Sequence, residues 1–102
     1  MKVSEFFKKE FEKIGVELIP AGNKVYVISN DYDINEEVDI YGAFVGLMAG
    51  LFKDPKEKAI AEVVDGFAFF CENELNIDEV TSEVTETIKA QVKKFKKTFE
   101  RS

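Results

Sequence analysis

Acidic and amide residues between Asp31 and Asp39 have the spacing of a calcium-binding loop. Asp31, Asp33, Asn35 and Asp39 would supply oxygen ligands at positions 1, 3, 5 and 9 of such a loop. Two requirements are missing, because Glu36 stands where the sharp turn needs glycine, and a glycine stands where the bidentate glutamate belongs. We therefore expect no metal site, and we interpret the segment as a solvated loop whose acids cap the following helix.

The same segment holds the densest group of acids in the chain and is a candidate partner-binding site. Its members are Asp31, Asp33, Glu36, Glu37 and Asp39. The chain has 20 acidic and 14 basic residues, a net charge of −6, and residues 1–88 alone carry −11. Such a charge repels nucleic-acid phosphates and attracts basic protein surfaces. We expect a protein partner with a basic surface, and no direct binding of nucleic acid or membrane.

The remaining basic charge gathers near the C-terminus, where residues 89–102 carry +5. The basic residues there are Lys89, Lys93, Lys94, Lys96, Lys97 and Arg101. We interpret this segment as the last turns of a helix, whose partial negative charge favours cations.

Residue types that catalysis requires are scarce. The chain has no histidine and one cysteine, Cys71, which excludes histidine triads, Cys-His dyads, zinc knuckles and disulfide frameworks. No phosphate-binding glycine loop and no GxSxG motif occurs. We expect a protein that is not an enzyme and binds no cofactor. Cys71 is interpreted as a buried small hydrophobe, and a lone cysteine without a recognisable signal peptide favours the cytoplasm.

Phe69 is the second candidate partner-binding residue, because it is out of register with its helix. The helix predicted from Pro55 to about Leu75 places its apolar residues on one side and its charged residues on the other. Phe69 falls in the middle of the charged side. Either the last helix covers Phe69 or the side chain anchors a partner, since aromatic residues are enriched at binding hot spots.

Three glycines spaced four residues apart define the third candidate, a helix-packing or dimer face. Gly42, Gly46 and Gly50 lie in the segment 40–52, which has no charged residue and no polar face. A segment of this length is more typical of a buried core helix than of a membrane span. The glycines favour close approach of another helix within the domain, with self-association and membrane contact as the alternatives.

Periodicity and capping signals predict the elements that position these residues. Apolar residues at helical spacing predict a first helix, which Ser4 caps and Gly15 ends. Alternating residues in 16–19 and 24–28 predict a hairpin with a four-residue loop, and Asn30–Asn35 is expected to be a loop. Asn35 would cap a helix that extends to Phe52.

The two remaining helices have the clearest start signals. Asp54 followed by Pro55 predicts the next helix, and Asn76 with Glu79 would form a capping box for the last one. The expected fold is a single domain over residues 1–102 of the mainly helical α+β class, with an N-terminal helix, one β-hairpin and three helices (α-β-β-α-α-α).

Two functions are compatible with these features. The first is a small, acidic, non-catalytic protein-interaction module, which could also form a homodimer. The alternative is a phage-type or antitoxin-type inhibitor whose acidic surface blocks the nucleic-acid-binding site of a basic protein. A self-associating module would be a dimer in light scattering, whereas an inhibitor of this kind would be a monomer.

Overall fold

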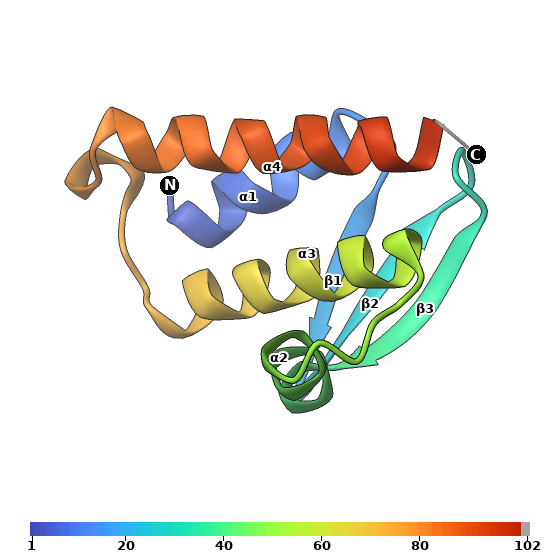
Figure 1. The fold of residues 1–102 in the computed structure, drawn as a ribbon. Coiled ribbons are helices and arrows are strands. Elements are labelled where there is room, and N and C mark those ends of the chain that lie inside the picture. The colour runs from blue at the N-terminus through green and yellow to red at the C-terminus, as the bar shows by residue number, and fades with distance from the viewer. Residues whose placement is uncertain (101–102) are drawn as a thin grey trace.

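The computed structural model describes residues 1–100 of the chain. Helix α1 (Val3–Glu12) is its first element (Figure 1). The apolar residues of this helix face the core. Val3, Phe7 and Phe11 are fully buried. The chain leaves the helix through Gly15, which has a φ of 81° and confirms the predicted left-handed residue. The predicted Ser4 cap is wrong, because the helix begins two residues earlier, at Val3, and its N-cap is Lys2.

The sheet has three antiparallel strands in the order β1-β2-β3. The predicted hairpin is confirmed as β1 (Glu17–Ala21) and β2 (Lys24–Ser29), although its loop has two residues, Gly22 and Asn23, where four were expected. Leu18 pairs with Val27, and both side chains are completely buried on the inner face of the sheet.

The third strand, β3 (Ile34–Asp39), corrects the prediction that a loop and a helix follow the hairpin. It pairs with β2 from Ser29↔Ile34 to Lys24↔Asp39. The strand lies at the edge of the sheet, so only Ile34 is buried and most of its other side chains are exposed. A sequence with so few apolar residues forms a strand because β2 supplies its hydrogen-bond partners.

Helices α2 (Ile40–Met48) and α3 (Pro55–Glu72) follow the sheet. The start predicted for α3 is confirmed, with Asp54 accepting a hydrogen bond from the Lys56 backbone N–H at 2.9 Å and Pro55 at the first helical position. Both helices end earlier than predicted, and α2 is capped by Asp39 and not by Asn35.

Helix α4 (Ser82–Glu100) closes the fold. The predicted capping box of Asn76 and Glu79 is present, but it starts a 3₁₀ turn, η1 (Ile77–Glu79), that precedes the helix. Four apolar residues of α4 are buried: Ile88, Val92, Phe95 and Phe99. The predicted basic residues Lys89, Lys93, Lys94, Lys96 and Lys97 are exposed on this helix, and Arg101 lies outside the described residues.

The elements form layers, with α1 and α3 between the sheet and α4 (Figure 1). Helix α2 lies at the lower edge of the molecule, where it follows β3 and packs against α3 (Figure 1). The fold is 59% helical and 19% strand, in agreement with the mainly helical α+β class. Within residues 1–100, no helix combines the length and the apolar character needed to cross a membrane.

Candidate functional site

The five predicted acidic residues do not form one cluster. They lie at both ends of the edge strand β3 and on both faces of the sheet. Asp31 and Asp33 lie in the turn between β2 and β3, where the Asp31 carboxylate packs against Gly15. Asp39 lies at the opposite end of β3, a strand that is about 17 Å long from Ile34 to Asp39. Within residues 1–100, no three Asp, Glu or Cys side chains are arranged as a metal site.

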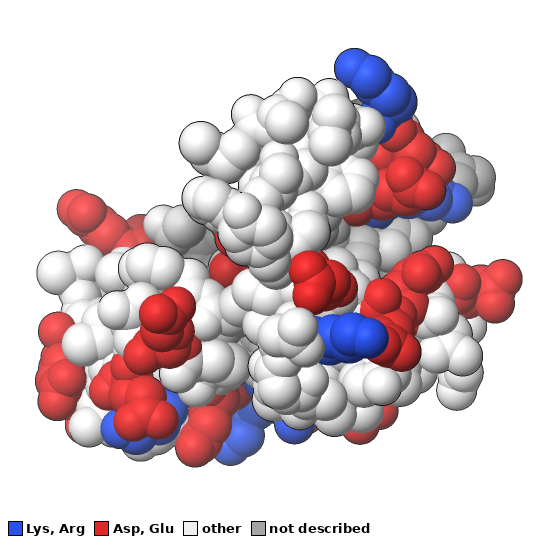
Figure 2. Space-filling model, turned by 90° about the horizontal axis from the view of Figure 1, so that it is seen from below, with Lys and Arg blue, Asp and Glu red and all other residues white. Residues whose placement is uncertain are grey.

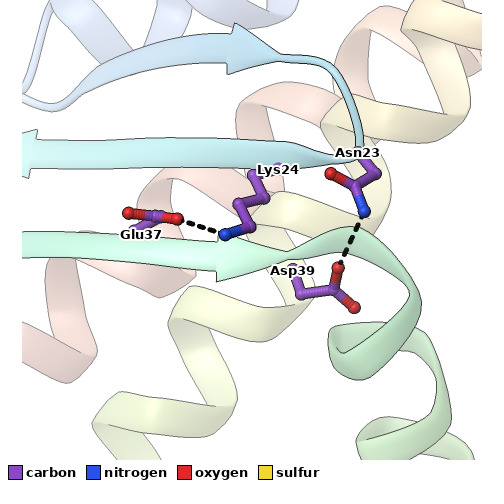
Figure 3. A network of polar contacts seen from close by, with 4 residues as sticks. All are labelled: Asn23, Lys24, Glu37 and Asp39. Atoms are coloured by element: carbon purple, nitrogen blue, oxygen red, sulfur yellow. Dashed lines mark hydrogen bonds and ion pairs between the residues drawn. The ribbon is translucent and has the colours of Figure 1, made fainter.

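Glu36 and Glu37 are neighbours in sequence but point to opposite faces of the sheet, as successive strand residues do. Glu37 forms an ion pair with Lys24 on β2, with an Oε1–Nζ distance of 2.5 Å (Figure 3). The hydrogen bond from Lys24 lowers the pKa of the Glu37 carboxyl from its usual 4.5, and the same bond raises the pKa of Lys24 above 10.5. Glu37 is therefore already engaged within the chain.

Asp39 holds the start of α2. Its Oδ2 accepts a hydrogen bond from the Gly42 backbone N–H at 2.7 Å, and its Oδ1 accepts one from Asn23 Nδ2 at 3.5 Å (Figure 3). The Ile40 backbone N–H also donates to the Asn23 carbonyl oxygen at 2.9 Å. These contacts tie α2 to the β1–β2 turn, so the acid at Asp39 acts first as a structural cap.

The three predicted glycines do not form one helix face. Gly42 and Gly46 belong to α2, whereas Gly50 follows the helix with a φ of 66°. The close approach expected at Gly46 is present, but the Phe52 ring makes it, where a second helix was predicted. Helix α2 packs against α3, and its buried residues are Ala43 and Gly46.

The opposite side of α2 is exposed, which corrects the prediction that residues 40–52 form a buried core helix. On α2, Tyr41 is 73% exposed and Met48 76%, and Leu51, just beyond the end of the helix, is 65% exposed. With Phe69 of α3, these exposed side chains make up what we call the α2 surface: Tyr41, Phe44, Val45, Met48, Leu51 and Phe69. In the view from below, uncharged side chains cover the region of α2, and both acidic and basic side chains border it (Figure 2).

Phe69 is 56% exposed, so the alternative that α4 covers it is wrong. Its ring meets Phe70 edge-on, with ring centroids 5.2 Å apart, which fixes its orientation on α3. Tyr41 and Phe44 line the same groove as Phe69. The sequence identified Phe69 through its position on a charged helix side, but it missed its partners on α2.

The α2 surface is comparable in size to the largest apolar patch of a typical monomer. With the usual areas of such side chains, the six residues expose on the order of 600 Å². The largest apolar patch of a typical monomer is about 300–600 Å² and is often functional. These side chains include no carboxylate, amine or thiol, so what they offer is mainly apolar contact area.

A second groove lies between α3 and α4, and charged residues of both signs line it. Its volume is about 450 Å³, and Glu62 and Lys94 line it from the two helices with an Oε2–Nζ distance of 3.5 Å. Gln91 also donates a hydrogen bond to the Glu62 carbonyl oxygen at 3.1 Å. These contacts within the chain bridge the groove, so the α2 surface is the stronger candidate.

Cys71 was expected to be buried, but it is only half-buried, beside the core. Burial raises the pKa of the thiol above its usual 9.0, while the nearby charge of Lys8 acts in the opposite direction. The thiol is therefore less ionised than a free cysteine at neutral pH, which is the reverse of what a nucleophilic cysteine needs.

Comparison of the chain with protein-family models, curated proteins and solved structures found no match.

Proposed function

We propose that this chain is a non-catalytic protein-interaction module that binds a partner protein through the α2 surface. The observation that supports it is that six large apolar side chains are exposed on and around α2, three of which, Tyr41, Phe44 and Phe69, line one groove. A polypeptide that covers them removes apolar area from water, which is the main favourable term in protein association. The proposal includes a cytoplasmic location and no direct binding of nucleic acid or membrane.

The charge of the chain supports a partner with a basic surface. Residues 1–88 carry −11, and Glu36 is exposed at the edge of the sheet. Such a field accelerates encounter with a basic protein, while Phe69 supplies an apolar contact that slows dissociation. Charge therefore acts mainly on the association rate, and the α2 surface acts mainly on the dissociation rate.

The alternative inhibitor function needs one continuous acidic surface that imitates a nucleic acid. Asp31 and Asp33 are separated from Asp39 by the length of β3, and Glu37 is paired with Lys24. These positions favour the interaction module over the inhibitor.

A pair of photo-cross-linking positions tests the proposal. A photoreactive residue at Met48, on the α2 surface, is compared in the native cell with one at Lys93, which is exposed on α4. A protein captured only at Met48 is then purified, and its binding to the chain is measured as association and dissociation rates.

Two sets of variants test the roles of the α2 surface and of the acidic residues in binding this partner. Phe69→Ala speeds dissociation and costs about 1–3 kcal/mol of binding free energy. Substituting both Glu36 and Glu37 by lysine slows association, and added salt reduces the difference. Tight binding of free nucleic acid at physiological salt, or a complex unaffected by both sets, contradicts the proposal.

A further inference from the structure

The α2 surface continues into a groove between α2 and α3. Tyr41 and Phe44 line it from α2, and Phe69 and Ala68 line it from α3. Its volume is about 640 Å³, which lies within the range of about 300–1,000 Å³ of small binding sites. Ala68 adds only a methyl group to this lining.

Two acids lie on the α3 side of this groove. Asp65, Phe69 and Glu72 are at positions i, i+4 and i+7, so they lie along one face of the helix. The Cα atoms of Asp65 and Glu72 are about 10.5 Å apart along the helix axis, which is about two turns. Within residues 1–100, neither side chain has a hydrogen bond or ion pair, and no Lys or Arg lines the groove.

We infer that the groove binds an amphipathic helix of the partner protein, with lysine or arginine residues two turns apart beside its apolar stripe. This inference rests on the proposed function and names the segment that the α2 surface receives. Apolar side chains of such a helix at i, i+3, i+4 and i+7 fill the space between Tyr41, Phe44 and Phe69. Its two basic residues then meet Asp65 and Glu72, whose charges have no partner in the described chain.

The charges favour this occupant over a second copy of the chain. Each copy has a net charge of −6, and the residues that line the groove include acids but no bases. Pairing two such grooves brings like charges together around the apolar contact, which disfavours association. A basic helix brings the opposite charge to the same place.

A tryptophan-labelled peptide tests the inference, because the protein has no tryptophan of its own. The peptide is an amphipathic helix of about 18 leucine and lysine residues with one tryptophan in the apolar stripe. We expect its fluorescence to shift to the blue as the protein is added, since the tryptophan leaves water. One control peptide has glutamate in place of every lysine, and another has the same composition with its leucines distributed around the helix.

Paired variants of the protein locate the binding. Asp65→Asn with Glu72→Gln should weaken binding of the lysine peptide at least about 10-fold. The matched control, Glu83→Gln with Glu86→Gln, removes the same charge from exposed positions of α4 and should change it less than about 2-fold. Phe69→Ala should weaken binding of the lysine peptide at least about 10-fold.

The outcomes separate the inference from the proposed function. If the glutamate peptide binds as tightly as the lysine peptide and Phe69→Ala weakens both, the basic preference is wrong while binding at the α2 surface stands. If the distributed peptide binds as tightly, or if no peptide binds, the helix-in-groove inference is overturned. A dimer in light scattering that Met48→Glu converts to a monomer also overturns it, because a second copy then covers the surface. The proposed function is tested separately, by the cross-linking experiment at Met48 and Lys93.

Discussion

The Phe52 ring packs directly on Gly46, so closely that a methyl group on this glycine would overlap the ring. Gly46 is buried in the last turn of α2, and Phe52 lies in the segment that connects α2 to α3. The contact lets the chain fold back under the helix after Gly50, which adopts a positive φ of 66°. Glycine weakens a helix, but at this position any larger side chain would overlap the Phe52 ring.

Substitutions at Gly46 test this contact. Gly46→Leu should cost about 1–3 kcal/mol of unfolding free energy, because the added side chain displaces the Phe52 ring. In a Phe52→Ala background, Gly46→Ala should be neutral or stabilising by up to about 1 kcal/mol, since alanine is the better helix former. Urea unfolding measures both. A higher unfolding midpoint for Gly46→Leu in the otherwise unchanged protein contradicts the packing argument.

Removing the cap of α2 should destabilise the protein modestly. Asp39→Ala loses the hydrogen bond from the Gly42 N–H and should cost about 1 kcal/mol of unfolding free energy. Asp39→Asn keeps a capping oxygen and should cost only a few tenths. Amide hydrogen exchange at Gly42 should accelerate in the alanine variant alone. Equal exchange in both variants argues against the cap.

The ion pair between Lys24 and Glu37 gives a pH dependence with a definite sign. The pKa of Glu37 is lowered in the folded state, so the stabilising contribution of its carboxylate is present above the usual 4.5 and is lost as the pH falls through the folded value. The pKa of Lys24 is raised, so its contribution is present below 10.5 and is lost as the pH rises through the folded value.

A carboxyl titration followed by NMR measures the first of these shifts. In Lys24→Met, the pKa of Glu37 should rise toward 4.5, because the hydrogen bond and the positive charge are gone. Lys93→Met serves as the control, since it removes an equal charge from α4. An unchanged pKa of Glu37 in Lys24→Met contradicts the role of the pair.

The thiol of Cys71 should react slowly. Burial raises its pKa above 9.0, so the folded protein should react with a disulfide reagent at pH 8 more slowly than the unfolded chain does. Lys8→Gln should slow the reaction further, because the charge of Lys8 lowers the same pKa. The raised pKa also means that this group stabilises the fold below pH 9.0 and that the contribution is lost as the pH rises further. A reaction as fast as that of the unfolded chain contradicts this prediction.

The sequence alone located several features that depend on a few neighbouring residues, although the helix caps predicted at Ser4 and Asn35 were wrong. Asp54 and Pro55 start α3, Gly15 adopts the left-handed conformation, and Asn76 with Glu79 forms a capping box. Each of these interactions closes within a few residues, so the pattern and the structure carry the same information. The period of its helix also placed Phe69 on the charged side of α3, but whether the last helix covers it was left open until the structure showed it exposed.

Only the tertiary structure decided the features that depend on distant partners. The segment Ile34–Asp39 has few apolar residues, and it becomes a strand because β2 is placed beside it. Hydrophobicity indicated that residues 40–52 avoid water, but it did not indicate which side of α2 another element covers. α3 packs against α2, which leaves Tyr41 and Met48 exposed and sets Tyr41 and Phe44 beside Phe69, more than twenty residues further along the chain. The candidate site was therefore only partly predictable, because its residues are brought together by helix packing and not by their spacing in the sequence.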